Sequence, residues 1–423
     1  MMSLERNYHK IYNAFLCILP VSFLFMKLSN IVVILFVLFN IINYKKLVFN
    51  KQKIIWCLII AMPLLLDLLF FWNNSSYYLA VKATEKHLLF LFFPVLIIGY
   101  NKKINLIKLL SIYVVVMLIV LTGLFIRYVI IYPDHILKYL EGRHLWEMGY
   151  HFTNSFKLHA PSLNMHVAFA SVSCFYVLIN KKFGKSVKSI IFFFLFLLSL
   201  FLVLYINTRV AVVCAIFGYF FVFLFITFKN YSSSVLIKKG ALVFLIFFLG
   251  MGAFVKIFPY TIKKFTSRSF ANMEMVGRLD EFENPEVEVF SSLVTRVSIW
   301  KSALELSKSN LLFGYGAVDA KEKLFEYYKE TNQKFLYKYK FPVHNQFIDY
   351  LIKYGILGPI ALLVFFSFLC YLGFINKNSL MFFFVILFFL SNLTDDFFIL
   401  YSGISFSAYW ASIFGNYSNE LDK

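Results

Sequence analysis

Acidic residues are scarce in this chain of 423 residues, with 22 Asp and Glu against 41 Lys and Arg, and the formal net charge is +19. Charged residues of both signs make up only 15% of the chain, whereas 61% is hydrophobic and the mean hydropathy is +0.75. No soluble domain has this composition. Because many separate apolar runs are long enough to cross a hydrocarbon core as helices, the composition predicts a polytopic α-helical membrane protein.

Cysteine is also rare and is poorly placed for metal binding or cross-linking. The five cysteines all fall inside apolar runs, and none is paired at metal-ligand spacing: Cys17, Cys57, Cys174, Cys214 and Cys370. The sequence therefore predicts neither a disulfide framework nor a cysteine metal site. No internal repeat and no low-complexity segment is visible.

Nucleotide-binding motifs are missing as well. The chain has no Walker loop, no dinucleotide fingerprint and no DxD-like nucleotide-sugar motif. A donor activated by a cytosolic nucleotide is therefore not expected. The positive charge does not indicate a nucleic-acid partner, because the lysines lie mostly in short loops where they report topology and face anionic lipid headgroups.

The apolar runs predict an all-α bundle of about twelve transmembrane spans. Residues 11–27 could pass for the core of a signal peptide, but no small-residue cleavage site follows, so we interpret them as the first span. The predicted spans are 11–27, 30–44, 54–72, 87–100, 106–131, 163–180, 189–206, 209–228, 240–257, 347–372, 379–394 and 397–415.

The lysines assign the two sides of this bundle. One set of alternating loops is rich in lysine, and the other set carries few basic residues. The rich loops contain Lys45, Lys46, Lys51, Lys53, Lys102, Lys103, Lys108, Lys181, Lys182, Lys185, Lys188, Lys229, Lys238, Lys239 and Lys377. The positive-inside rule then places both termini in the cytoplasm and the segments 73–86, 132–162 and 258–346 outside.

This topology divides the chain into three parts. A first membrane domain covers residues 1–257 and includes the outer loop 132–162, a large helical outer loop covers 258–346 between spans nine and ten, and a second membrane domain covers 347–423. An active site on the outer side has no nucleotide supply, so its donor should be carried by a lipid.

The large outer loop has its own helical pattern. An acidic run at 280–288 is interpreted as a solvated surface, and a stripe at spacings of three and four then predicts the buried face of an amphipathic helix. The Gly314–Gly316 segment is expected to end that helix as a flexible turn, before a second helix over 319–331. The stripe consists of Phe290, Leu293, Val297, Trp300 and Leu304.

His344 is the first candidate for chemistry, because it lies where the large loop re-enters the membrane. Pro342 stops the preceding segment, and Asn345 or Gln346 can cap the following helix. The positive end of a helix dipole disfavours imidazolium, and a neutral imidazole can accept a proton from a hydroxyl nucleophile. The alternative is a histidine that only caps the helix or anchors at the interface.

Two arginines are candidates for anion binding. Arg209 follows Asn207 and Thr208 between two apolar spans, where an arginine is costly unless it pairs or faces a polar cavity, and it lies at a helix N-terminus suited to phosphate. The alternative is a snorkelling arginine that reaches headgroups. Arg296 lies beside the apolar stripe and could hold phosphate oxygens with two N–H groups, or it could be an ordinary solvated side chain.

The outer-loop histidines give only a weak case for a metal. His159 and His166 are seven residues apart and share a helix face, but no cysteine or HExxH pattern accompanies them. We therefore predict that the protein needs no metal and no other cofactor.

These segments resemble the O-antigen ligase and polymerase superfamily. The resemblance is carried by the helix from Thr295-Arg296 to Trp300, by Phe313-Gly-Tyr-Gly316, and by His344-Asn345 followed by a helix that ends in Gly355-Ile-Leu-Gly358. Asn207-Thr208-Arg209 is similar to the Ser/Thr-Arg motif that opens the eighth span of this family. The His159–Pro161 region, with Ala160 between, resembles the His-Pro segment before the sixth span.

The resemblance implies a metal-independent, inverting glycosyltransferase of the bacterial inner membrane with its active site facing the periplasm. The donor would be a glycan on undecaprenyl pyrophosphate, and the acceptor would be lipid A–core in a ligase or a growing glycan in a polymerase. Arg209 and Arg296 would hold the pyrophosphate, and His344 would orient or deprotonate the acceptor hydroxyl. His159, Asn345 and Trp300 are candidate substrate-binding residues by the same resemblance.

One alternative lies in another class. A polysaccharide transporter or flippase should carry ionisable residues at mid-membrane and a repeated architecture. Asp67 is the clearest charge inside a predicted span. The other polar groups collect in the large loop and at helix ends, which favours an enzyme.

Overall fold

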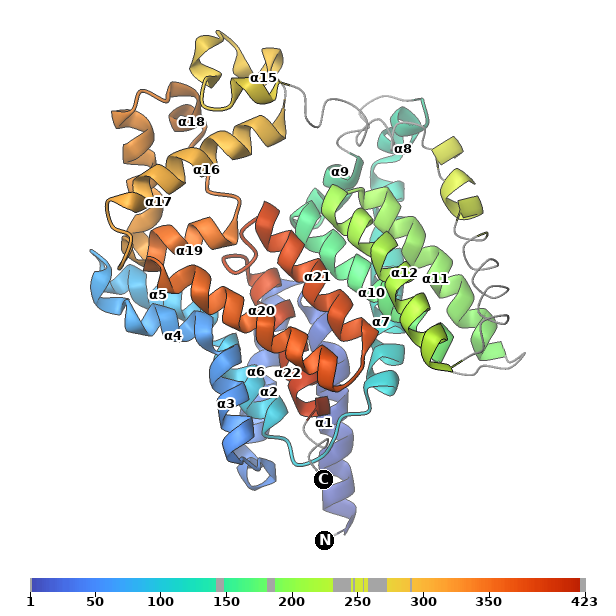
Figure 1. Ribbon diagram of the computed structural model, residues 1–423. Coiled ribbons are helices and arrows are strands. Elements are labelled where there is room, and N and C mark those ends of the chain that lie inside the picture. Colours follow the sequence, from blue (N-terminus) through green and yellow to red (C-terminus); the bar gives the residue numbers. More distant parts are fainter. Residues whose placement is uncertain are drawn as a thin grey trace.

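The described part of the chain is helical. The computed structural model describes residues 2–141, 148–180, 187–230, 245, 248–253, 255–257, 272–289 and 291–418 (Figure 1). Within these residues no strand forms, and a single isolated β-bridge joins Leu47 and Tyr100. The predicted all-α class is therefore confirmed for the described residues.

Five of the described helices are long and apolar enough to cross a membrane. They are α7 (Leu106–Ile131), α10 (Ala160–Asn180), α11 (Val187–Ile206), α12 (Arg209–Asn230) and α20 (Leu357–Ile375). A bent pair, α3 (Lys51–Ile60) and α4 (Met62–Leu69), would be a sixth. These helices are those of a multi-pass membrane protein.

The remaining helices of the bundle are shorter or more polar. They are α1 (Met2–Ser22), α2 (Met26–Ile42), α5 (Tyr77–His87), α6 (Leu89–Ile98), α21 (Ser379–Thr394) and α22 (Tyr401–Ser418). A count of twelve spans stays a prediction, since the predicted ninth span, 240–257, lies largely outside the described residues.

Two predicted spans are wrong as continuous helices. The 54–72 segment bends by 68° between α3 and α4, where Pro63 stands in the first turn of α4 and lacks an N–H to bond to α3. The 347–372 segment breaks at Gly355, which separates α19 (Gln346–Tyr354) from α20. Gly355 has φ 60° and ψ −154°, a conformation that costs little only for glycine.

Loops predicted to lie on the same side do meet in space. At one end of the bundle, Val48 N–H donates to the Gly99 carbonyl, and the Asn416 side chain bonds to the backbone of Ile97 and Ile104. The beginning of α1 and the end of α22 lie at this end (Figure 1). The 73–76 segment and the large loop meet at the opposite end, where Asn73 Nδ2 donates to the Gly314 carbonyl at 2.9 Å. Among the described residues, these contacts link some of the lysine-rich loops to one another and the 73–76 segment to the large loop, while the sidedness of the loops as a whole stays a prediction.

The large loop folds around a core of its own, and we call residues 272–289 and 291–345 the loop domain. Its main helices are α16 (Ser292–Lys308) and α17 (Gly316–Glu330), accompanied by the short helices α15 (Pro285–Glu288) and α18 (Lys334–Tyr339). The core also includes Ile352 of α19, so this domain is built directly onto the helix that follows His344.

The sequence predicts the wrong side of α16 as its buried face. Leu304 is 43% exposed, and the buried side chains are instead Val294, Ser298, Ile299, Ser302, Ala303 and Leu306. The serines are tolerated in this core because they bond locally; Ser302, for example, donates to the Gln333 side chain at 2.6 Å. Phe290 of the predicted stripe lies outside the described residues.

The glycine turn of the loop domain is not a flexible linker. Gly314 and Gly316 have φ of 63° and 84°, and each lies so close to neighbouring backbone that a side chain would overlap it. Tyr315 N–H donates to the Ile352 carbonyl at 2.7 Å, and Ile356 N–H donates to the Leu311 carbonyl at 2.8 Å. The turn therefore seats the loop domain against the break between α19 and α20.

The contact between the loop domain and the α19–α20 break gives a first prediction. Gly355→Ala would hold alanine at a positive φ, which costs about 1–3 kcal/mol, and its methyl group would overlap the Leu312 carbonyl. We expect a clear fall in unfolding temperature and yield in detergent. Gly123→Ala in α7 is the matched control, because a Cβ there meets nothing within 4 Å. Equal unfolding temperatures for the two variants would contradict this account of the break.

Candidate active site

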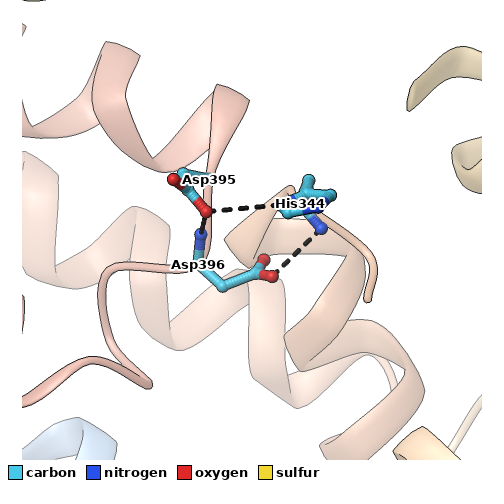
Figure 2. Close-up of side chains that lie close together, drawn as sticks. All are labelled: His344, Asp395 and Asp396. Carbon is cyan, nitrogen blue, oxygen red and sulfur yellow. Dashed lines mark hydrogen bonds and ion pairs between the residues drawn. The ribbon is translucent and has the colours of Figure 1, made fainter. Parts of the chain in front are cut away.

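The site is organised by hydrogen bonds between two segments that are far apart in sequence, 343–346 and 393–398. His344 has φ 53°, and its backbone N–H donates to Asp396 Oδ2 at 3.0 Å (Figure 2). Asn345 Nδ2 donates to the Leu393 carbonyl at 3.2 Å, and Phe398 N–H donates to Gln346 Oε1 at 2.8 Å. Each residue from 344 to 346 thus has a fixed partner on the 393–398 segment, which covers the end of α21 and the residues that follow it.

Asn345 has the capping role that the sequence predicts. Its Oδ1 accepts from the N–H groups of Phe347 and Ile348 at 3.0 and 3.2 Å, which satisfies the first turn of α19. Both polar atoms of its amide are therefore bonded within the protein. The structure assigns Asn345 to holding His344 in place and gives no support to direct substrate binding.

The His344 ring lies against the Asp395 carboxylate. His344 Nδ1 and Asp395 Oδ1 are 3.4 Å apart, and the same oxygen accepts the Asp396 N–H at 3.0 Å (Figure 2). Burial alone would raise the pKa of Asp395, but the His344 hydrogen bond, nearby His159 and the Asp396 N–H outweigh it and hold the pKa below its ordinary value. Because an ionised carboxylate can only accept, His344 donates from Nδ1 and keeps the lone pair of Nε2 available.

A cavity of about 180 Å³ opens beside Asp395. Arg209, the first residue of α12, and Arg296 of α16 both line it, together with Asp395. Tyr150 also lines it, from α9 (Met148–Asn154). His159 Nδ1 lies 3.7 Å from Asp395 Oδ2, whereas His344 faces Oδ1 of the same carboxylate. The structure therefore brings Arg209 and Arg296 to the cavity that Asp395 lines, and His159 and His344 to the Asp395 carboxylate itself.

The electrostatics of this cavity favour an anionic ligand. Two guanidinium groups face one ionised carboxylate, so its charge is net positive. Burial lowers the pKa of His159, nearby His344 and Arg296 lower it further, and Asp395 only partly offsets this. His159 is therefore neutral near pH 7. Burial raises the pKa of Tyr150, so its hydroxyl keeps its proton and can donate to a ligand.

Local backbone features set the positions of Arg209 and Tyr150. Asn207 has φ 53° and ends α11, so α12 begins at once with Arg209. Asn164 Nδ2 donates to the Thr208 hydroxyl at 2.9 Å across this break. Any side chain at Gly149 would overlap the Ile206 carbonyl, so glycine allows α9 to carry Tyr150 up to the end of α11.

Trp300 acts on the segment before His344. Its indole N–H donates to the Val343 carbonyl at 3.0 Å, and it packs against the core of the loop domain. This contact fixes the chain that leads into His344. A substrate-binding role for Trp300 stays a prediction, and the structure gives it a positioning role first.

A buried polar network lies behind the site. His87 Nδ1 is 2.6 Å from Asp67 Oδ2, and His87 Nε2 is 2.8 Å from the Phe398 carbonyl. Tyr354 of α19 donates its hydroxyl hydrogen to Asp67 Oδ1. The Asp67 carboxylate thus links α4 to α5 and α19. His87 of α5 also bonds to Phe398, which lies just after Asp395 and Asp396.

Sequence reasoning missed Asp395, Asp396 and Tyr150. Two adjacent carboxylates between apolar segments, in a chain with few acidic residues, were the available signal for the aspartates. Nothing local marked Tyr150 among 27 tyrosines. His159 and His166 do not act together, because His166 is buried with Nε2 on the Ser402 carbonyl at 3.2 Å. The predicted outer loop 132–162 also contains Arg143, His144 and Glu147, which lie outside the described residues.

One group of side chains could hold a metal ion. Ligand atoms of His344, Asp395 and Asp396 all lie within 4.8 Å of one another. The facing oxygens already accept the N–H groups of His344 and Asp396, and these bonds account for the clustering without an ion. Independence from metal stays a prediction, to be tested by chelation.

A comparison with protein families identifies the segment that carries the arginines and the histidine. A family model described as O-antigen ligase matches residues 193–366. This segment is thus similar to the O-antigen ligase family. The match runs from α11 to α20 and supports the predicted superfamily; it includes Arg209, Arg296 and His344, while His159, Asp395 and Asp396 lie outside it. No curated protein sequence matches the chain.

The two aspartates should respond to pH in opposite ways. Burial, Asp349 and Asp395 raise the pKa of Asp396 to about 8, so ionising it destabilises the fold. The folded pKa is above the unfolded value, so stability falls as the pH rises from about 4 to about 8, by at most ~1.4 kcal/mol per pH unit. Asp396→Asn should therefore gain stability over wild type at pH 8, and the gain should shrink at pH 5.

Asp395→Asn is the matched control. The folded pKa of Asp395 is depressed, so its stabilisation is present above its unfolded pKa and is lost only as the pH falls through the folded value. This variant should be less stable than wild type at both pH 5 and pH 8. Unfolding temperatures in detergent check both. A loss for Asp396→Asn that is equal at the two pH values would contradict the assignment of the buried proton.

Proposed function

We propose that this protein is an O-antigen ligase-type glycosyltransferase. It moves a glycan from undecaprenyl pyrophosphate to a sugar hydroxyl of lipid A–core at the periplasmic face of the bacterial inner membrane, with both termini in the cytoplasm. The observation that carries this proposal is the cavity where Arg209, Arg296 and Asp395 meet beside His344. Its net positive charge suits a pyrophosphate, and its histidine–carboxylate pair suits an alcohol nucleophile.

The arginines act on the leaving group. When the bond between the anomeric carbon and the phosphate oxygen breaks, the electron pair goes to that oxygen and negative charge grows on the pyrophosphate. Arg209 at the N-terminus of α12 and Arg296 on α16 approach from different elements and stabilise this charge. Since their positions are preset by the α11–α12 break and by the loop domain, little reorganisation is needed.

His344 acts on the acceptor. The acceptor oxygen forms the new bond to the anomeric carbon, and its proton passes to His344 Nε2. Asp395 holds Nδ1–H and stabilises the imidazolium that results. Attack from the face opposite the leaving pyrophosphate inverts the anomeric centre in one displacement. His159, which is neutral and lies near the other oxygen of Asp395, is proposed to contact the substrate.

The same site fits a second member of the superfamily. A polymerase would use the same donor and would transfer it to a growing glycan, and the family match supports both reactions equally. A transporter is not supported by Asp67, because its carboxylate is bonded to His87 and Tyr354. Neither the ligase reaction nor the polymerase reaction needs nucleic acid, and in both the donor comes from the lipid bilayer.

A lipopolysaccharide gel of a deletion strain distinguishes the two reactions. Bare core, with long glycan left on undecaprenyl pyrophosphate, identifies a ligase. Core bearing a single repeat unit identifies a polymerase. An unchanged ladder would refute both lipopolysaccharide reactions.

Substitutions at the site should separate chemistry from folding. His344→Ala and Arg209→Ala should insert at normal levels but lose transfer by at least about 100-fold, as expected when a base or a charge-stabilising donor is removed. Arg209→Lys should recover little, because an ammonium lacks the paired N–H groups of guanidinium. Transfer of lipid-linked glycan by membranes of equal protein content is the measurement. Full activity of the His344→Ala protein would overturn the mechanism.

Chelation tests the metal-free mechanism. Dialysis of the purified protein against EDTA should leave the transfer rate unchanged, because the arginines supply the positive charge that a metal would otherwise provide. Loss of activity that magnesium, manganese or zinc restores would instead place an ion at His344, Asp395 and Asp396.

A further inference from the structure

An apolar surface lies where the loop domain meets the membrane helices. We call it the interfacial patch and define it by Trp72, Tyr77, Leu312, Phe313, Ile356 and Leu357, which are between 42% and 66% exposed. The rings of Trp72 and Phe313 meet edge to face with centroids 5.9 Å apart, and Tyr77 stacks on Phe71. The patch joins three parts of the chain: the segment before and at the start of α5, the 311–313 tip, and the start of α20.

Polar groups of the same segments bond to one another, and we call these bonds the polar seam. Asn73 Nδ2 donates to the carbonyls of Phe313 and Gly314 at 3.1 and 2.9 Å. Ser75 donates from its N–H and its hydroxyl to the two oxygens of Asp319, at 2.7 and 2.5 Å. The polar groups of these segments bond to one another, whereas their large apolar side chains are exposed. The exposed apolar surface is therefore held in a defined arrangement by these hydrogen bonds.

The occupant that fits this surface is lipid. From Leu357 the surface continues along α20, a candidate membrane span, through Ile360 and Leu363, which are 46% and 51% exposed. On the other side, α4 turns away from α3 by 68° and exposes Leu68 and Leu69. Figure 1 shows α4 and α5 running beneath α17. Exposed apolar side chains of candidate membrane-crossing helices thus follow the patch along the chain on both sides.

The residue types of the interfacial patch indicate how deep it would lie in a bilayer. Trp and Tyr are the residues that concentrate at the boundary between hydrocarbon and headgroups. Lys82 lies over the Tyr78 ring at 4.3 Å, next to Tyr77 of the patch, and Lys86 follows one turn later on α5. Apolar side chains rimmed by lysine match the headgroup region of a bilayer that contains anionic lipid.

We propose that the interfacial patch inserts into the headgroup layer of the bilayer and anchors the loop domain to the membrane surface. The anchor fixes the height of α16 and of the segment before α19, which carry Arg296 and His344. If the proposed function is right, this height matches the pyrophosphate of a lipid-linked donor. The anchoring itself does not depend on which reaction the site performs.

Spin-label accessibility tests the anchor in the full-length protein. The five native cysteines are replaced, the protein is reconstituted in vesicles of phosphatidylethanolamine and phosphatidylglycerol, and a nitroxide is attached at Leu312→Cys. Leu312 is 64% exposed, and two exposed control sites bracket this value: Leu363→Cys, 51% exposed on α20, and Val287→Cys, 72% exposed on α15 in the loop domain. Collisions with oxygen report lipid, and collisions with a water-soluble nickel chelate report water.

The label at residue 312 should favour oxygen over the nickel chelate, with a ratio between those of residues 363 and 287. A ratio equal to that of residue 287 would place the patch in water and overturn the proposal. Low accessibility to both reagents would also overturn it, because another protein surface would then cover the patch.

A second measurement keeps the native cysteines, three of which are buried. Tryptophan fluorescence is recorded in vesicles whose lipids carry bromine near the headgroup. Trp72→Phe should remove a substantial part of the quenched emission, since Trp56 and Trp410 are buried. An unchanged quenched fraction would contradict insertion whether or not the enzyme is active, so this result is independent of the proposed reaction.

Discussion

The arrangement of the site depends on the hydrogen bonds between residues 344–346 and the 393–398 segment. His344 adopts a left-handed backbone conformation that a non-glycine residue rarely takes, and the Asp396 carboxylate accepts its N–H. Asn345 and Gln346 add two further bonds to the same segment. Without these hydrogen bonds, nothing would hold the backbone before α19 in the conformation that places the His344 imidazole against Asp395. Asp395 in turn lines the cavity, so it connects His344 to it.

Next to these hydrogen bonds, each part of the chain contributes side chains to the cavity that is lined by two arginines. The first membrane domain contributes Arg209 and Tyr150 at helix ends, the loop domain contributes Arg296, and the last membrane segment contributes Asp395. The loop domain is seated against the α19–α20 break by the Gly314–Gly316 turn, and the Asp67–His87 pair ties α4 and α5 to Phe398. Placing charged groups on separate rigid elements is how a protein presets an electrostatic environment.

Sequence reasoning reached the components of this site better than their arrangement. The apolar runs at 106–131 and 379–394 became α7 and α21 with the predicted bounds, because polar residues mark both ends. Arg209 and His344 stood out because charge and imidazole are unusual at a membrane boundary. The break at Gly355 was not predictable, since it depends on contact with Leu311 and Leu312 of a distant turn. The Asp395–His344 pairing spans 51 residues, and no local pattern encodes it.

The central claim is that Asp395 works through His344 as one unit, and a double-mutant cycle tests it most directly. Transfer from a lipid-linked donor would be measured for His344→Ala, Asp395→Ala and the double variant, in vesicles of equal protein content. The account predicts that the double variant is no slower than His344→Ala alone, because Asp395 has no task once the imidazole is gone. Losses that multiply in the double variant would show that the carboxylate acts on the substrate independently, and would contradict the proposed pairing.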